Sequence, residues 1–209
     1  MTANPVKTQF LKNLDLAADR VTRQLAACRT ETGTWRGYLS SSALATAVAA
    51  FALHRIAPDE NGATVQSALY WLAENANPDG GWGDTPQSTS NLSTTLLCWA
   101  AFSVAEETDV RVNAASEAAE TWIQGRIVDL APAKVSDAIL THYGQDRTFS
   151  VPILTMCALA GRLGPMETAW QYVPQLPFEL AVLPSRCYRL VRMPVVSYAL
   201  PALIAIGLA

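Results

Sequence analysis

The sequence predicts an all-α protein built from a repeated helical unit. Apolar residues recur at three-and-four spacing along most of the chain, which is the period of an amphipathic helix. A Gly-Trp turn also occurs twice: Gly33 and Trp35 belong to the first copy, and Gly80, Gly81 and Trp82 to the second. The two tryptophans are 47 residues apart. A period of this length, with a helix on each side of the turn, predicts stacked helical hairpins that bury a shared apolar face.

Composition allows one domain with a large core, because half of the 209 residues are hydrophobic and only 16% are charged. The net charge of −3, without a basic tract, argues against nucleic acid as a partner. The first 20 residues carry charges of both signs and have no apolar core, so a secretory signal is not expected. No apolar run reaches about 18 residues, so a membrane-spanning helix is not expected either.

Eight helices follow from the apolar periodicity, with boundaries set by capping and helix-breaking residues. Their N-caps include Ser41 or Ser42, and Ser90 or Asn91. Residues 58–62 and 77–81 are predicted loops, and Gly164 with the proline after it is a predicted helix stop. Short loops between helices favour antiparallel neighbours. The expected helices are Pro5–Arg29, Ser42–Ile56, Ala63–Asn75, Ser90–Ala105, Val112–Ile127, Ala133–Tyr143, Val151–Leu163 and Phe178–Arg192.

The Gly-Trp motif is predicted to be structural. A large indole at the corner between a loop and a helix can cover the ends of two helices. The glycines, Gly33 in one copy and Gly80 with Gly81 in the other, permit the tight turn before it. We therefore expect Trp35 and Trp82 to be packed at a helix start in equivalent positions.

The second copy resembles a known repeat. Residues 75–84 read Asn-Ala-Asn-Pro-Asp-Gly-Gly-Trp-Gly-Asp. This segment is similar to the Gln-Trp repeat of squalene-hopene cyclases, oxidosqualene cyclases and related prenyltransferases. It departs from that repeat in one respect, since Asn75, and Cys28 in the first copy, stand where glutamine is usual.

The last third of the chain resembles the N-terminal region of the same cyclases. The matching segments, in order, are residues 148–154 (Thr-Phe-Ser-Val-Pro-Ile-Leu), residues 173–180 (Val-Pro-Gln-Leu-Pro-Phe-Glu-Leu), residues 192–194 (Arg-Met-Pro) and Tyr198. Together the two resemblances cover most of residues 20–205. They imply an (α/α) barrel-like helical repeat module of the terpenoid cyclase and protein prenyltransferase toroid type, one of the two modules that such cyclases contain.

The resemblance also implies an acid that the chain lacks. Triterpene cyclases protonate an alkene or epoxide with an Asp-x-Asp-Asp-type motif, and no such motif occurs here. An Asp-Asp-x-x-Asp metal motif is also absent. Asp59 with Glu60, and the acidic residues of segment 106–109, lie in predicted loops and are expected to face solvent. We predict no catalytic residue, no metal site and no cofactor in this chain, and no activity when it is alone.

The resemblance places a few apolar residues nearest a substrate cavity. Aromatic faces there can stabilise carbocations by cation–π attraction. Ordinary core packing is the alternative for each residue taken singly. The candidates are Phe149, Pro152, Ile153, Val196 and Tyr198.

Three arginines recur at every third position, Arg186, Arg189 and Arg192, beside apolar residues. A helix would carry them as a basic stripe next to an apolar one, which suits contact with anionic lipid. A solvated face on a soluble module is the alternative. Because no secretory signal is expected, we predict a cytoplasmic protein, and lipid contact by the stripe would make it peripheral on the inner face of the cytoplasmic membrane.

Four cysteines are widely spaced and form no Cys-x-x-Cys pair. Buried free thiols in a reducing compartment are the simpler prediction, and a disulfide or metal set is the alternative. The four are Cys28, Cys98, Cys157 and Cys187.

These observations lead to one hypothesis and two alternatives. The leading hypothesis is the N-terminal module of a squalene-hopene-cyclase-like triterpene cyclase, acting on squalene or a similar polyprene. The uncharged stretch 195–209 favours a fragment of a longer protein whose C-terminal cyclase module is the missing partner. A non-catalytic helical repeat module that binds an isoprenoid or a protein partner is the first alternative. A protein prenyltransferase β-type subunit is disfavoured, because His54 and His142 have no zinc-ligand spacing.

Overall fold

The computed structural model describes residues 5–37, 39–106 and 108–175. The chain divides into two units, Met1–Ser40 and Ser41–Ala209. Helices account for the regular structure of the described residues, where the only strand-like pairing is an isolated bridge between Arg29 and Trp35. The predicted all-α helical repeat module is confirmed.

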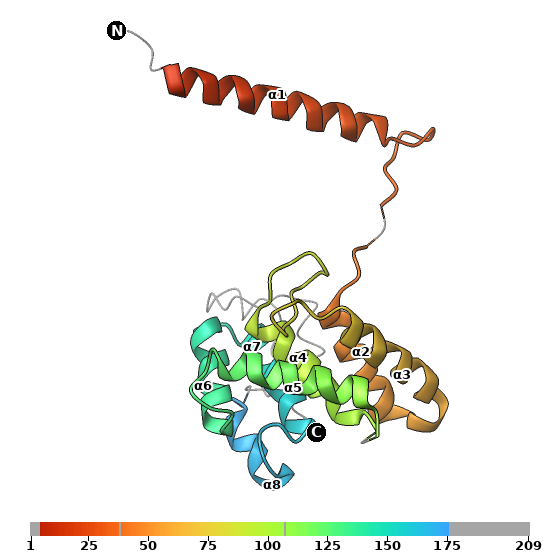
Figure 1. Ribbon diagram of the computed structural model, residues 1–209, viewed down its shortest axis with the longest axis vertical. Helices are drawn as coiled ribbons and strands as arrows, with labels where there is room; N and C mark the ends of the chain where they lie inside the picture. The colour runs from red at the N-terminus through yellow and green to blue at the C-terminus, as the bar shows by residue number, and fades with distance from the viewer. Residues whose placement is uncertain (1–4, 38, 107, 176–209) are drawn as a thin grey trace, which may run out of the picture. The chain divides into compact units, whose positions relative to one another are not determined.

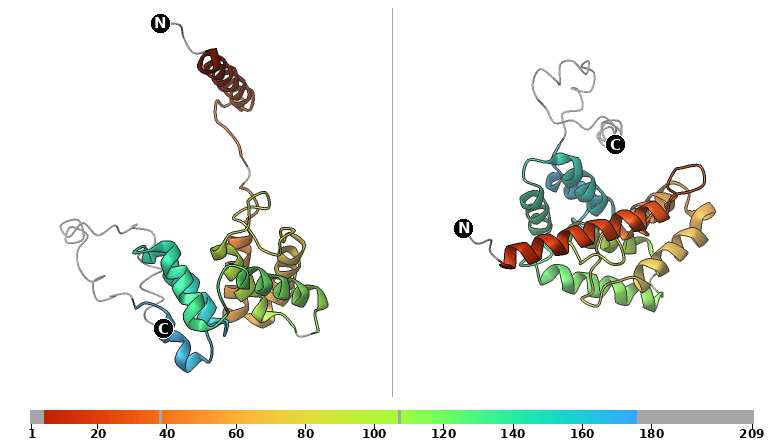
Figure 2. Two further views of the ribbon diagram at one scale, coloured as in Figure 1. Left: turned by 60° about the vertical axis from the view of Figure 1, so that its left-hand side comes forward. Right: turned by 90° about the horizontal axis from the view of Figure 1, so that it is seen from above.

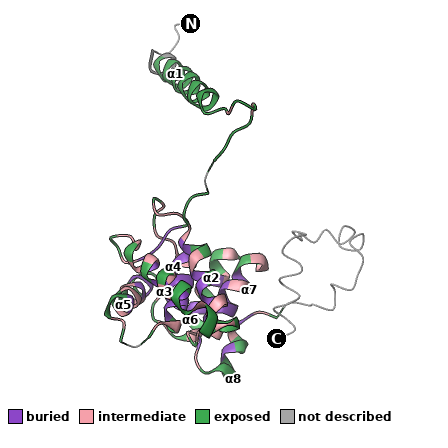
Figure 3. Cartoon of the chain, turned by 90° about the vertical axis from the view of Figure 1, so that its right-hand side faces the viewer, coloured by how far each residue is buried: buried purple, intermediate pink, exposed green. Residues whose placement is uncertain are grey.

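The first unit consists of α1 (Pro5–Ala27) and the first Gly-Trp turn. The helix ends at Ala27, two residues before the predicted boundary, and the backbone N–H of Cys28 donates to the carbonyls of Gln24 and Leu25. The apolar residues of α1 with described side chains, including Phe10 and Leu14, are exposed, and Figure 3 shows the helix green along its length.

The second unit contains seven α-helices among its described residues, with α4 at the centre. Helix α4 packs against α2, α5 and α7, while α3 packs against α2 and α5 (Figures 1 and 2). Two short 3-10 turns follow α4 and α8 directly. The helices are α2 (Ala43–Ile56), α3 (Pro58–Glu74), α4 (Leu92–Ala101), α5 (Val110–Gln124), α6 (Pro132–Tyr143), α7 (Arg147–Leu159) and α8 (Met166–Ala169).

Side-chain caps fix where several helices begin. Of the predicted alternatives, Ser42 caps α2 by accepting from the Ala45 N–H, and Asn91 caps α4 by accepting from the Thr94 N–H. Asp109 and Asp146 cap α5 and α7 in the same way. These local bonds satisfy backbone donors that the helix itself leaves unpaired.

The loop predicted at residues 58–62 was wrong. Residues 58–62 form the first turns of α3 instead of a loop, because Pro58 stands at the start of the helix and Asp59 with Glu60 complements the helix dipole in its first turn. The short helix α8 and the 3-10 turn after it were not predicted. The predicted helix Phe178–Arg192 lies outside the described residues.

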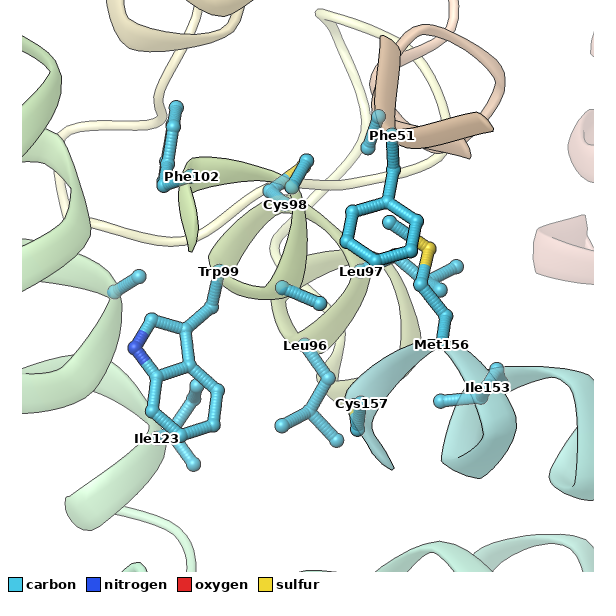
Figure 4. Packing of buried hydrophobic residues seen from close by; sticks show 14 of the residues in the cluster. Phe51, Leu96, Leu97, Cys98, Trp99, Phe102, Ile123, Ile153, Met156 and Cys157 are labelled. Carbon is cyan, nitrogen blue, oxygen red and sulfur yellow. The ribbon is translucent and has the colours of Figure 1, made fainter. Parts of the chain in front are cut away.

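The hydrophobic core of the described chain lies between Ala43 and Val173. Every residue of α4 after Leu92 is buried, which is the pattern of a helix surrounded by neighbours. Figure 4 shows Met156 of α7 projecting toward Leu97 of α4 and Phe51 of α2. This packing holds the helices that carry the candidate site.

The described cysteines are all free. Cys98 and Cys157 are buried as predicted, and burial raises the pKa of the Cys157 thiol to about 12. Cys28 is exposed, which corrects the prediction of a buried thiol at this position. It comes directly after α1, in the first unit, and the core residues all belong to the second. Cys187 lies outside the described residues.

Candidate functional site

The two Gly-Trp turns have the same backbone hydrogen bonds, shifted by 47 residues. Each turn contains a glycine with positive φ, 82° at Gly33 and 85° at Gly80. In the first turn (residues 30–35), the Thr30 N–H donates to the Thr34 carbonyl (2.7 Å) and the Gly33 N–H donates to the Thr30 carbonyl (2.9 Å). In the second turn (residues 77–82), the Asn77 N–H donates to the Gly81 carbonyl (2.8 Å) and the Gly80 N–H donates to the Asn77 carbonyl (2.9 Å). The repeat read from the sequence is therefore a repeat of backbone geometry.

The two indoles make equivalent hydrogen bonds but differ in burial. Trp35 Nε1 donates to the Leu25 carbonyl (2.7 Å), and Trp82 Nε1 donates to the Leu72 carbonyl (2.9 Å). Each bond ties the indole to the helix before its turn. Trp82 is 1% exposed, whereas Trp35 is 52% exposed. The packing predicted for both tryptophans is found at Trp82 and is wrong for Trp35.

Helix α5 explains why the second turn is buried. A Cβ on Gly81 would lie 2.7 Å from the Trp122 indole, so a residue with a side chain could not take its place. The Trp122 Nε1 donates to Asp79 Oδ2 (2.8 Å), which joins α5 to the turn. In the first turn, Thr34 and Thr32 stand at the positions of Gly81 and Asp79. The first turn keeps its shape but lacks both features that join the second turn to α5.

The Asp79 carboxylate makes most of the side-chain contacts that hold the second turn. Its Oδ1 accepts from the Ser90 hydroxyl (2.6 Å) and the Gly81 N–H (3.1 Å), and Arg126 lies 3.7 Å from Oδ2. Partial desolvation raises the pKa of Asp79, but the hydrogen bonds from Ser90, Trp122 and Gly81 and the charge of Arg126 outweigh it and hold the pKa below its usual value. The carboxylate therefore joins the turn to Ser90 and to α5.

A second carboxylate ties the second turn to the start of α4. Asp84 Oδ1 accepts from the Asn91 side-chain amide and from the Thr94 hydroxyl, both at 2.9 Å. The cap Asn91 follows Trp82 by nine residues, whereas Ser42 follows Trp35 by only seven. The second copy therefore has two extra residues between its turn and its helix.

Asn75 does not replace the glutamine of the repeat as a tie between helices. Its side-chain amide donates to the carbonyl of Trp71 (2.9 Å), within α3 itself. In the described chain, the indole bonds and the Asp79 and Asp84 bonds join the elements around the turn instead.

The candidate cavity residues with described positions lie on one face of α7, at spacings of three and four. Phe149 is 56% exposed, Pro152 is half-buried, and Ile153 is 5% exposed within the core. The face thus passes from solvent into the core within about one turn. Val196 and Tyr198 lie outside the described residues.

One residue that the sequence did not single out, Tyr143, contacts Phe149 and joins it to a second one, Ser93. The Phe149 ring stacks on Tyr143 at the end of α6, with ring centroids 5.9 Å apart and 25° between the planes. The Tyr143 hydroxyl shares a hydrogen bond of 2.8 Å with the hydroxyl of Ser93 on α4. The hydrogen bond joins positions 50 residues apart, so no local sequence pattern indicates it.

Comparison with known protein families identifies the fold. A family model described as the squalene-hopene cyclase N-terminal domain matches residues 18–127, more than half of the chain. The chain belongs to this family. Searches of curated proteins and of solved structures found no significant match.

The squalene-hopene cyclase match covers both Gly-Trp turns and the helices α2 to α5. It stops before α6 and α7, so the candidate cavity residues lie outside the matched segment. The resemblance noted at residues 148–154 remains the basis for assigning them.

Three of the acidic residues in the matched segment lie at the starts of helices. Asp59 and Glu60 are exposed as expected, though in the first turn of α3 instead of a loop. Asp109 is half-buried, caps α5 and accepts a hydrogen bond from the Gln66 side chain, so the prediction that it faces solvent was wrong. Within residues 5–37, 39–106 and 108–175, no cluster of three or more His, Cys, Asp and Glu residues could hold a metal ion.

The residues predicted to contact the membrane in this squalene-hopene cyclase module all lie outside the described part of the chain. They are Arg186, Arg189 and Arg192. Among the described helices, none has both the length and the apolar character needed to cross a bilayer.

Proposed function

We propose that this chain is the N-terminal module of a squalene-hopene-cyclase-like polyprene cyclase. The module contributes part of the wall of an apolar substrate cavity, and a separate cyclase module supplies the catalytic acid. The observation that carries this proposal is the family match over residues 18–127. The reaction requires protonation of an alkene or epoxide, and the printed sequence holds no Asp-x-Asp-Asp motif for that step.

The exposed edge of α7 is the proposed wall. Phe149 is an aromatic residue that is 56% exposed, and Pro152 lies beside it on the same face of the helix. An aromatic face attracts a carbocation that passes close to it, with a strength of about 0.5–1 kcal/mol at an exposed site and more when water is excluded. Ile153 lies behind them in the core, and Val196 and Tyr198 complete the proposed wall.

A membrane surface is the second proposed partner. Squalene and similar polyprenes are apolar and dissolve in the bilayer, so an enzyme that acts on them gains access by binding its surface. The arginine stripe at positions 186, 189 and 192 would contact anionic lipid on the cytoplasmic side. Vesicle co-sedimentation tests this, and changing all three arginines to glutamine should reduce binding to anionic vesicles but not to neutral ones.

Reconstitution tests the enzymatic part of the proposal. The chain is co-expressed with a cyclase module that carries the Asp-x-Asp-Asp motif, and squalene products are measured by gas chromatography with mass spectrometry. We expect cyclic products with both proteins, fewer with the cyclase module alone and none with the chain alone. Phe149→Leu should lower or redistribute the products. Val128→Ala, which changes an exposed side chain in a loop, is the control.

The non-catalytic alternative makes a different prediction in the same experiment. A helical module that only binds an isoprenoid or a protein partner would leave the activity of the cyclase module unchanged, and Phe149→Leu would then have no effect on products. That result would overturn the proposed function.

A further inference from the structure

We propose that Tyr143 is a positioning residue that fixes the ring of Phe149 and is itself held by Ser93. That a substrate would meet this fixed ring rests on the proposed function, in which Phe149 belongs to the cavity wall. The geometry itself is independent of that function, because it joins three described residues on α4, α6 and α7.

An exposed ring needs a support if it is to keep one orientation. Phe149 is 56% exposed, so much of its surface contacts no protein atom. It lies in the first turn of α7, where the core does not yet surround the helix face. Stacking on Tyr143, at 5.9 Å between centroids, is the ring contact that restricts it, and aromatic pairs of this kind prefer a defined offset.

Tyr143 is held at both ends. Its hydroxyl bonds to Ser93, which is 7% exposed in the core side of α4. Its backbone closes the turn between the two helices, because the Asp146 N–H donates to the Tyr143 carbonyl (3.0 Å) and Gly144 takes a φ of 56°. Asp146 then caps α7 by accepting from the Thr148 N–H (2.8 Å). The Tyr143 ring therefore has little freedom to follow Phe149 if that ring rotates.

The position of Ser93 is itself held by contacts between the start of α4 and the segment that follows the second Gly-Trp turn. It lies between the cap Asn91 and Thr94, and both of these donate side-chain hydrogen bonds to Asp84 beside the turn. A continuous path of contacts thus runs from the second turn through the start of α4 to Tyr143 and Phe149. The structural repeat motif and the proposed cavity wall are physically connected by this path.

Fluorine NMR tests the positioning directly. The 209-residue chain is labelled with 4-fluorophenylalanine, which reports on its five phenylalanines. The Phe149 resonance is assigned by its loss in Phe149→Leu. The ring current of Tyr143 should displace this resonance from that of free 4-fluorophenylalanine. Tyr143→Leu should abolish the displacement, and Ser93→Ala should reduce it.

The matched control is Ser136→Ala. Ser136 is another buried serine, on α6, whose hydroxyl donates to the Tyr172 carbonyl (2.6 Å), so its loss should not move the Phe149 resonance. An unchanged Phe149 resonance in Tyr143→Leu would overturn the proposal. So would an unchanged resonance in Ser93→Ala. If Ser93→Ala does not fold, Tyr143→Leu decides alone, and unfolding is recognised because all the resonances collapse together.

Binding of an apolar cation separates this inference from the proposed function. N,N-dimethyldodecylamine, kept below its micelle concentration, serves as the probe. We expect it to shift the Phe149 resonance, with an affinity that falls about two- to fivefold in Ser93→Ala and is unchanged in Ser136→Ala. No binding to the wild-type chain, together with the expected resonance changes, would count against the cavity wall and support the positioning. Binding that is equally strong in all variants would overturn the positioning.

Discussion

At the scale of single residues, Trp35 and Trp82 make the same hydrogen bond but differ in how far they are buried. Trp35 and Trp82 each donate an indole hydrogen bond to the carbonyl ten residues earlier, but only Trp82 is buried. A net hydrogen bond contributes about 0.5–1.5 kcal/mol, whereas burial of a large aromatic side chain contributes several times more. The same residue type in the same turn therefore has unequal effects on stability.

Trp82→Ala should lower the free energy of unfolding by about 3–5 kcal/mol, because it removes the bond and leaves a cavity beside Phe102. Trp35→Ala should lower it by less than about 1 kcal/mol. Urea unfolding followed by circular dichroism measures both. Equal losses in the two variants would show that Trp35 is buried in solution.

Asp79 makes stability depend on pH. Its pKa is held below the unfolded value near 3.8, so its contribution is fully present above that value and is lost as pH falls through the lower, folded pKa. We expect the thermal midpoint of the wild type to fall more steeply than that of Asp79→Asn between about pH 5 and pH 2. Asp137→Asn, which changes an exposed carboxylate on α6, is the control. Parallel curves for wild type and Asp79→Asn would contradict this role.

At the scale of elements, contact between the second turn and α5 decides which residues the turn can hold. Gly81 lies against the Trp122 indole with no room for a Cβ, and Asp79 accepts the indole hydrogen. Helix α3 shows the opposite case at Gly62, which lies in the helix with nothing within 4 Å of an added Cβ. Two glycines that look alike in the sequence therefore have different constraints.

Gly81→Ala should destabilise the protein by about 1–3 kcal/mol, since the added methyl group must displace Trp122. Gly62→Ala should stabilise it by about 0.5–1 kcal/mol, because alanine is the better helix former and meets no neighbour. Chemical denaturation of both variants against wild type measures the difference. Destabilisation by Gly62→Ala would indicate a loop at residues 58–62 and restore the sequence-based prediction.

At the scale of the whole molecule, the hydrophobic core belongs to one unit. All core residues of the described chain lie between Ala43 and Val173, whereas α1 and the first turn belong to the unit Met1–Ser40. The family match extends across both units, from residue 18 to residue 127. The family match and the hydrophobic core of the described chain therefore have different boundaries along the sequence.

A shortened chain of residues 41–209 should keep a helical circular dichroism spectrum and unfold cooperatively in urea, because it retains the whole described core. The full chain measured in parallel is the reference. A broad, non-cooperative transition in the shortened chain alone would show that the first unit is needed for folding.

The sequence by itself determined the features that depend on near neighbours. The helical class and the 47-residue repeat follow from local patterns and were predicted correctly. The caps of α2 and α4 were each predicted as one of two neighbouring residues, and Ser42 and Asn91 are the ones that the structure shows. The hydrogen bonds that the two turns share span at most about ten residues, so both copies form them whatever surrounds them.

Only the tertiary structure decided burial and the contacts of the candidate site. Trp82 is buried where α5 packs against the second turn and Phe102 contacts the indole. The first turn has Thr32 and Thr34 in place of Asp79 and Gly81, but only the structure shows that those two residues contact α5. Ser93, Tyr143 and Phe149 come together because α7 packs against both α4 and α6. Burial and long-range contacts depend on how several helices pack together. A local pattern can therefore indicate which residues form a turn, but it cannot indicate which of those residues are buried in the core.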